Sequence, residues 1–319
     1  PSLNYSLLKE IPNGPRCLAV ERSPIDGPAI RIGSYVDTYF TNRENISNLF
    51  YVESEEISLT DTILRLYNSL VETEDFNPTM ELVLNRCTEI GAYASIVDKS
   101  KIEARIPSEL FEKLRQKGMS NGKIVLTKSE YSQALNSISS LASTPLVHAE
   151  IMEGEGQIII DQFKYEFSLK IPNVDRSRKF KIMIDKLKFD NKHKLVTGID
   201  IKAGEARQLD FGEQFMVRRY DLQGILYSIG MQHLMRELKL NDWTYEFKFI
   251  YLPKISGLPS ICVKTGAEWC NRSLESVSYN GKTYPGFMQI IRDADWYIEN
   301  QEFSTNRVLI ENQFNFNIE

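Results

Sequence analysis

The sequence lacks several patterns that define whole classes of protein. No apolar run approaches the roughly 18–20 residues that a membrane-spanning helix needs. The opening Pro-Ser-Leu-Asn-Tyr has neither the basic nor the apolar region of a secretory signal, so we expect a cytoplasmic protein without membrane contact. Lys and Arg (38) are outnumbered by Asp and Glu (43), which disfavours a protein that coats nucleic acid but allows a local basic groove.

Cysteine is scarce, with four widely spaced residues in 319. Reduced thiols of a cytosolic protein are the simpler interpretation. Some nucleases hold an iron–sulfur cluster with one N-terminal cysteine and three C-terminal ones. Here the C-terminal part supplies Cys262 and Cys270 alone, without a tight Cys-x-x-Cys pair, so we do not predict a cluster.

Other catalytic signatures are missing as well. The three histidines, His148, His193 and His233, do not have the spacing of metal ligands. Ser-His-Asp and Cys-His catalysis have no supporting local signature. A phosphate-binding Gly-x-x-x-x-Gly-Lys loop is absent too, so we do not expect ATP to be used.

The composition is that of a globular protein, and its first part reads as helical. Hydrophobic residues make up 42% and aromatic residues 11%, which disfavours disorder. Helical patterns cover 63–71, follow Asn77-Pro78, and cover 128–142. Since no linker is evident, we predict a single domain, although the length alone also allows about two. Its predicted parts are a helical region 1–145, a core 146–260 and a C-terminal extension 261–319.

The pattern changes near residue 147 from helices to strands. Residues 164–171 alternate with period two, and further strands are predicted at 180–189 and 195–202. Helical spacing returns at Leu222, Ile225, Leu226 and Ile229, before a strand at 245–252 and a helix at about 285–300. This order predicts an α/β fold with a central mixed sheet flanked by helices.

Two carboxylates fall within segments whose pattern predicts burial. Asp185 interrupts the apolar run 182–187, and Asp200 lies between two isoleucines at the end of the third strand. Asp200 and Lys202 are two residues apart, so they project from the same face. Glu166, on the polar face of the first strand, could join them. A buried carboxylate is costly without a cation or several donors nearby.

Convergent carboxylates with a lysine suit metal-assisted hydrolysis of a phosphodiester. Mg²⁺ prefers hard oxygen ligands, with water and substrate phosphate completing its shell. The metal activates water, and the lysine can orient the nucleophile or stabilise the developing charge. The alternative is a structural salt-bridge cluster, which an Asp-x-Lys pair alone does not exclude.

The following helix narrows the interpretation. Arg219, Gln223 and Tyr227 fall at i, i+4 and i+8, a polar and aromatic stripe opposite the apolar one. Together with Asp185 and the segment 200–202, this helix resembles the PD-(D/E)XK nuclease superfamily, and its Gln-x-x-x-Tyr pattern is similar to the RecB-like branch. Within that branch the chain is most similar to the exonuclease VIII (RecE-type) nucleases of phages and prophages, with lambda exonuclease a more distant relative.

The resemblance implies a role for each matching residue. Asp185, Asp200, the Ile201 carbonyl and Glu166 would ligate Mg²⁺, with Mn²⁺ as an alternative, and Lys202 would assist the attacking water. The residues implied to be catalytic are Lys202, Asp200, Asp185, Gln223 and Tyr227.

The N-terminal part resembles the family's Gly-x-x-x-His helix, with Asp37 where the histidine is expected. A helix here places Gly33 and Asp37 on one face. We predict that Asp37 lies near the other carboxylates and belongs to the metal site, shifting its preference from Mn²⁺ toward Mg²⁺. The alternative is an aspartate that is exposed or paired with Arg31.

Residues 170–194 form a basic hairpin, with nine Lys or Arg against three acids. Part of it is predicted to contact phosphates, and the alternative is a solvated hairpin face. The aromatic residues Trp296, Tyr297, Phe314 and Phe316 suit a core or an oligomer contact. The residues predicted to bind DNA are Arg176, Arg178, Lys179 and Arg219.

The function implied by the resemblance is a Mg²⁺-dependent DNA exonuclease of phage-type recombination. It would digest one strand of linear duplex from the 5′ end and leave a 3′ single strand for an annealing protein. The family's ring-shaped oligomers imply self-association. Two alternatives remain open: a superfamily nuclease of other polarity or endonuclease activity, and a non-catalytic DNA-binding or assembly protein.

Overall fold

The computed structural model describes residues 2–19, 27–53, 57–120, 122–171, 173, 175–205, 210–265, 274–304 and 307. Two compact units are present, one formed by Pro1–Arg43 with Gln133–Glu319 and the other by Glu44–Ser132. The second unit is therefore an insertion, whereas the sequence led us to expect one extended domain. Cys270 and the aromatic tail residues Phe314 and Phe316 lie outside the described residues.

The inserted unit is mostly helical, as the hydrophobic periodicity predicts. Its core is formed by apolar residues of four helices, among them the fully buried Leu66, Leu70, Leu110 and Leu114. Two short strands, β1 and β2, pair in parallel. The elements between residues 43 and 142 are η3 (Arg43–Asn45), α3 (Ile46–Leu49), β1 (Phe50–Val52), α4 (Asp61–Glu72), α5 (Met80–Glu89), α6 (Lys99–Glu103), α7 (Ser108–Ser120), β2 (Ile124–Leu126) and α8 (Lys128–Ala142).

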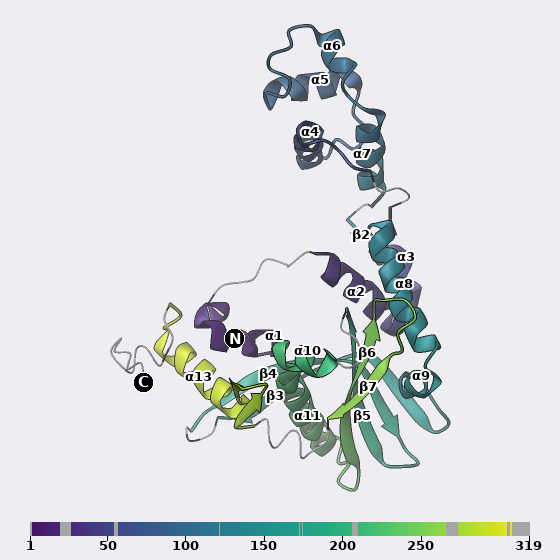
Figure 1. The fold of residues 1–319 in the computed structure, drawn as a ribbon. Coiled ribbons are helices and arrows are strands. Elements are labelled where there is room, and N and C mark those ends of the chain that lie inside the picture. The colour runs from purple at the N-terminus through teal and green to yellow at the C-terminus, as the bar shows by residue number, and fades with distance from the viewer. Residues whose placement is uncertain are drawn as a thin grey trace. The chain divides into compact units, whose positions relative to one another are not determined.

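The main unit is built on a five-stranded mixed sheet flanked by helices, which confirms the predicted fold class (Figure 1). The strand order is β3-β4-β5-β6-β7; only β5 and β6 run in parallel, and the other neighbours are antiparallel. The strands are β3 (Gln157–Lys170), β4 (Ser177–Asp190), β5 (Leu195–Gly204), β6 (Thr244–Pro253) and β7 (Ile261–Thr265), with a separate β8 (Ser276–Tyr279) and β9 (Lys282–Pro285) hairpin.

Helices connect and cover these strands. The helices of the main unit are α1 (Tyr5–Leu8), η1 (Ile11–Asn13), η2 (Pro15–Leu18), α2 (Pro28–Thr41), α9 (Pro145–Ile151), α10 (Phe211–Val217), α11 (Tyr220–Glu237) and α13 (Phe287–Asn300). In the described part of the chain, none of the helices combines the length and apolar character of a membrane span.

The helix α11 packs very closely on the sheet because glycines stand at the contact. A Cβ atom on Gly198 of β5 would lie 2.6 Å from Met231 Sδ of α11. A Cβ on Gly230 of α11 would overlap the side chain of Ile182 on β4. Gly198 and Gly230 are both buried at this contact. The middle of α11 is thereby held against β4 and β5.

The sheet divides between β4 and β5. These strands pair from Lys186–Ile199 to Asp190–Leu195 and not beyond. Further along β4, the N-terminal segment takes over the free edge, with Leu3 N donating to Lys179 O at 2.8 Å and Leu3 O accepting from Lys181 N at 2.8 Å. We call the point where β5 leaves β4 the fork. Asp185 lies directly at it, outside both of the ladders that β4 forms.

Candidate active site

Asp185 and Asp200 meet at the fork, as their positions in the sequence predict. Asp200 is 2% exposed and Asp185 8% exposed. The Ile201 N–H donates to Asp185 Oδ2 at 2.6 Å, which ties the carboxylate of β4 to the end of β5. Gln223, in the first turn of α11, donates from Nε2 to Asp200 Oδ1 at 2.5 Å. Three elements thus converge on two buried carboxylates.

Lys202 completes the pair expected from the Asp-x-Lys spacing. Its ammonium forms an ion pair with Asp200 Oδ2 and lies 5.4 Å from the centre of the Tyr220 ring. Burial alone would lower the pKa of Lys202, but the charges of Asp200 and Asp185 outweigh it and raise the pKa. Lys202 is therefore a protonated cation held between a carboxylate and an aromatic face.

Asp37 belongs to the same group of carboxylates. It lies in the third turn of α2, and its Oδ1 atom is buried without a hydrogen-bond partner. Burial and, to a smaller extent, the neighbouring charge of Asp200 together raise the pKa of Asp37 to about 6. Burial also raises the pKa of Asp185 well above its usual value, with Asp200 and Asp37 adding to the effect. We call Asp37, Asp185, Asp200 and Lys202 the Asp200 cluster.

The Asp200 cluster carries more negative charge than its surroundings balance. Three carboxylates face the ammonium of Lys202, while the nearby Lys186 is paired with Asp161 at 2.7 Å. As the side chains stand, no three Asp, Glu, His or Cys residues in the described ranges are arranged to hold a metal ion. The donor set still fits Mg²⁺, because it consists of hard oxygens, includes the unpartnered Asp37 Oδ1 and lacks a compensating charge.

Two tyrosines border the cluster. Tyr227, one turn after Gln223 on α11, is buried, and burial raises its pKa to about 12. Tyr5, from α1, donates its hydroxyl to Arg218 O at 2.5 Å. Burial raises the pKa of Tyr5, and the charges of Lys202 and Asp200 also act on it. The sequence analysis did not identify Tyr5 or Tyr220 as site residues. Nothing in the local sequence links Tyr5 to residues some two hundred positions later.

A polar cavity of about 440 Å³ opens beside Lys202. Its wall includes Tyr5 and Tyr220, so the two tyrosines and Lys202 share one space. The charged residues that line it are Lys9, Lys202, Glu205, Arg218 and Lys254. Four cations against one carboxylate make this cavity suited to an anionic substrate group.

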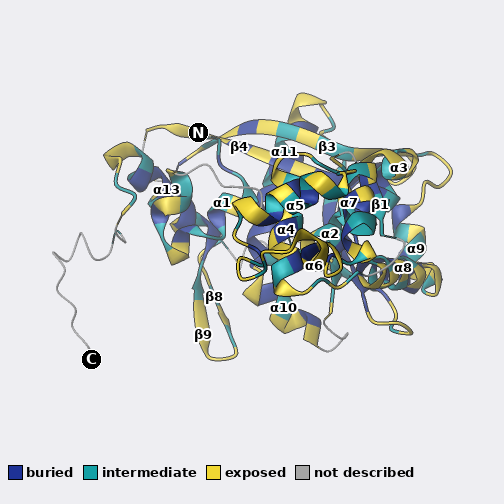
Figure 2. Ribbon diagram, turned by 90° about the horizontal axis from the view of Figure 1, so that it is seen from above, coloured by how far each residue is buried: buried dark blue, intermediate teal, exposed yellow. Residues whose placement is uncertain are grey.

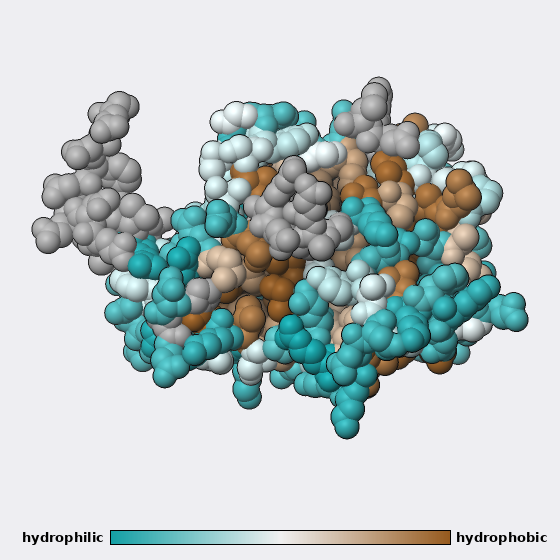
Figure 3. Space-filling model, turned by 90° about the horizontal axis from the view of Figure 1, so that it is seen from below, coloured by the Kyte–Doolittle hydropathy of each residue, from teal (hydrophilic) through white to brown (hydrophobic). Residues whose placement is uncertain are grey.

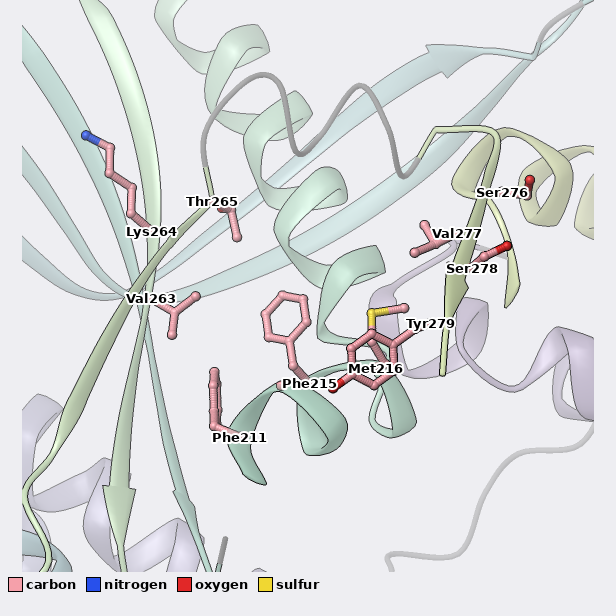
Figure 4. Close-up of a pocket in the computed structure, with 11 residues that line it drawn as sticks. Phe211, Phe215, Met216, Val263, Lys264, Thr265, Ser276, Val277, Ser278 and Tyr279 are labelled. Carbon is pink, nitrogen blue, oxygen red and sulfur yellow. The ribbon is translucent and has the colours of Figure 1, made fainter. Parts of the chain in front are cut away.

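A larger cavity, about 700 Å³, has a different character (Figure 4). Rings and aliphatic groups of α10, β7 and β8 line it, including Phe211, Phe215 and Val263. Its charged lining residue, Lys264, points away from it and pairs with Glu246. Apolar surface also gathers in the middle of the face seen in Figure 3. Its described lining contains no carboxylate, histidine or cysteine, in contrast to the Asp200 cluster.

Glu166, which was predicted to be a metal ligand, is not brought to the Asp200 cluster in this structure. Glu166 is exposed on β3 and forms an ion pair with Lys181 at 2.9 Å. Its register partner Lys181 precedes Asp185 by four residues, about 13 Å along a strand. The alternation of polar and apolar residues along β3 places Glu166 on a polar face. The Asp200 cluster, however, lies at the fork, where β5 leaves β4.

Three of the predicted DNA contacts are structural ion pairs instead. Arg176 binds Asp295 at 2.9 Å, and Arg178 binds the same carboxylate at 2.7 Å. Both also pair with Glu299, so they anchor α13 to β4. Arg219, the residue before α11, is buried and binds Asp221 through two nitrogens at 2.9 Å. These guanidinium groups are therefore engaged within the protein, and Arg176 keeps 40% of its side chain exposed.

The comparisons with known proteins add a distant likeness. No family model matches the chain, and no curated protein matches it. A crystal structure from Eubacterium rectale, described as a "Putative exonuclease", is similar over all of this chain and 89% of its own, with a TM-score of 0.47 and 13% identity. A likeness at this level does not transfer an activity, so the geometry of the Asp200 cluster has to support any function.

Proposed function

We propose that this protein is a metal-dependent DNA exonuclease related to the RecB-like branch of the PD-(D/E)XK superfamily. The observation that supports it is the Asp200 cluster: three carboxylates and one lysine at the fork, with Gln223 donating to Asp200. A structural salt-bridge cluster would balance its charges, and this one does not. We further propose the RecE-type reaction, digestion of one strand of linear duplex from its 5′ end.

Asp37, Asp185, Asp200 and the Ile201 carbonyl are the groups we propose to hold Mg²⁺. When bound, the ion supplies Lewis-acid polarisation of the phosphate and activation of the attacking water. Gln223 keeps Asp200 oriented through its amide N–H, and the Ile201 N–H does the same for Asp185. The other oxygens, Asp200 Oδ2 and Asp185 Oδ1, take no part in these two hydrogen bonds.

Lys202 acts in this scheme as a cation and a hydrogen-bond donor. Its raised pKa keeps the Nζ protons on the side chain at neutral pH. The Tyr220 ring restricts where the ammonium can move, since it lies against the aromatic face. From this position Lys202 can stabilise negative charge on a phosphate oxygen in the adjoining cavity.

The experiment that tests the proposal follows both strands of a linear duplex. The duplex carries a different fluorophore at each 5′ end and is incubated with Mg²⁺, with Mn²⁺ or with EDTA. We expect stepwise loss from the 5′ end with Mg²⁺ and no loss with EDTA. A closed circular duplex of the same sequence is the control, and cleavage of the circle would show an endonuclease instead.

Lack of cleavage under every condition would favour the non-catalytic alternative. Binding of the duplex in EDTA then distinguishes a DNA-binding assembly protein from one that does not recognise DNA. Self-association and an annealing protein as partner are further parts of the proposal. Light scattering and co-purification with such a protein test them separately.

A further inference from the structure

The outer face of the β3–β4 hairpin is basic and exposed to solvent. Alternate residues of a strand share a face, so lysines of the two paired strands lie side by side on it. The opposite face of the hairpin packs on α11, where the Phe167 and His233 rings are 5.0 Å apart. Exposed stretches of both strands are visible in Figure 2. We define the lysine face as the exposed side chains Lys164, Lys170, Lys179 and Lys181.

The lysine face keeps positive charge after ion pairing. Elsewhere in the hairpin Arg176 and Arg178 are neutralised by α13, and Lys186 by Asp161. On the lysine face, Lys164 and Lys179 form no ion pair within the described chain. Lys181 pairs with Glu166 and Lys170 with Asp175, both in solvent, where such pairs contribute little.

A cavity of about 450 Å³, which we call the fork cavity, is lined by residues of the N-terminal segment, β3, β4 and α11. Lys164 and Lys181 of the lysine face contribute to its wall, and so does Tyr227 of α11, which borders the Asp200 cluster. The cavity exists because β5 has left β4 here and the N-terminal segment fills only part of the gap. Tyr5 borders both this cavity and the one beside Lys202, so the two cavities are neighbours.

The lining combines cations with aromatic rings. Tyr5, Tyr165 and Tyr227 all contribute to the wall, and Tyr165 continues a stack with Phe167 at 6.0 Å. Proteins that bind single-stranded nucleic acid pair a positive groove, which follows the phosphates, with aromatic side chains that stack on bases. A base-paired strand keeps its bases inside the duplex, where such rings do not reach them.

We infer that the lysine face and the fork cavity bind single-stranded DNA, with phosphates on the lysines and a terminal nucleotide in the cavity. This inference rests on the proposed nuclease function, because it gives that function a path for one strand next to the Asp200 cluster. In this inference the phosphate contacts are Lys164, Lys179 and Lys181. The arginines predicted from the sequence, Arg176, Arg178 and Arg219, do not take that role.

The test measures binding without cleavage. A fluorescein-labelled single strand is titrated with protein in EDTA at several salt concentrations, and a duplex of equal length is titrated in parallel. The test variant is Lys164→Gln with Lys179→Gln and Lys181→Gln. The matched control removes three exposed lysines elsewhere, Lys192→Gln, Lys239→Gln and Lys282→Gln, so that both variants lose the same charge.

We expect the test variant to lose about 2 from the slope of log K against log salt on the single strand, about 0.7 for each phosphate contact. The control should keep most of the slope. Equal slopes for the two variants, or a loss confined to duplex, overturn the inference. Cleavage by the wild type is scored separately. If the wild type cleaves DNA but the slope does not depend on the lysines, the role of the lysine face is refuted and the nuclease function stands. If the slope depends on the lysines but the wild type does not cleave DNA, the nuclease function is refuted and the role of the lysine face stands.

Discussion

Two ionic clusters of the main unit differ in how their charges balance. We call Arg176, Arg178, Asp295 and Glu299 the Asp295 cluster, in which two guanidinium groups face two carboxylates. The Asp200 cluster has three carboxylates and one ammonium. Both contain an aspartate that is almost fully buried, Asp295 at 3% and Asp200 at 2% exposed. Burial of a carboxylate is therefore common to the two clusters, and the missing counter-charge is what distinguishes the Asp200 cluster.

The difference in charge balance should affect the folding stability of the protein. A buried carboxylate with a complete set of partners contributes to a stable fold, whereas repelling carboxylates destabilise it until a cation arrives. Natural proteins tolerate such repulsion mainly where chemistry requires it. The same Asp→Asn substitution should therefore have opposite consequences in the two clusters.

The largest expected effect is on activity. Asp200→Asn should lower the rate of cleavage by at least about 10³-fold, because the members of a catalytic group act together. The fold should survive, since the Asn carbonyl can still accept from Gln223 Nε2. Rates on end-labelled duplex with Mg²⁺ measure this. Asp242→Asn, at an exposed ion pair with Lys194, is the control of equal charge change. An Asp200→Asn protein with a tenth of wild-type activity would remove Asp200 from the mechanism.

The next largest effect is on stability, in the balanced cluster. Asp295→Asn should lower the free energy of unfolding by about 3 kcal/mol, because it leaves Arg178 partly buried beside a neutral group. Urea denaturation followed by fluorescence measures the loss.

The salt dependence of DNA binding should not change for Arg178→Gln, since that guanidinium is engaged with α13. A flattened slope for Arg178→Gln would restore it as a phosphate contact.

The unbalanced cluster should respond in the opposite direction. Asp185→Asn in EDTA should raise the free energy of unfolding by about 1 kcal/mol, because it removes a buried carboxylate that Asp200 and Asp37 repel. Its amide oxygen can still accept from the Ile201 N–H. Adding Mg²⁺ should raise the Tm of the wild type and not that of Asp185→Asn. Destabilisation by Asp185→Asn would show that this carboxylate is a structural partner.

The smallest effect concerns pH. Asp37 has a pKa of about 6 in the folded protein against 3.8 for an unperturbed carboxyl, so the folded state holds its proton more tightly. Stability in EDTA should therefore fall as pH rises from about 4 to about 6 and level off above that, by about 1 kcal/mol after allowance for solvent screening. Unfolding curves across this range should show the fall in wild type and a flatter profile in Asp37→Asn. Parallel profiles would place Asp37 outside the cluster.

The strands and helices of the main unit were largely predictable from residue patterns. The helix predicted over 128–142 is observed as Lys128–Ala142, and the strand predicted over 195–202 as Leu195–Gly204. Periodicity succeeds here because each element buries one face locally. The division into two units was not predictable in this way, since residues 44–132 have the same helical character as their neighbours and no linker composition separates them.

The candidate site likewise has features that are local to one strand or helix and features that depend on tertiary contacts. The spacing of Asp200 and Lys202 within one strand, and of Gln223 and Tyr227 within one helix, is a local property that the sequence determines by itself. Whether a charged residue is free is not local. Arg178 pairs with a carboxylate 117 residues away, and Glu166 pairs across a hairpin at a distance from the fork. Only the tertiary structure decided which charges neutralise one another, because ion pairs form between residues that folding, and not the chain, brings together.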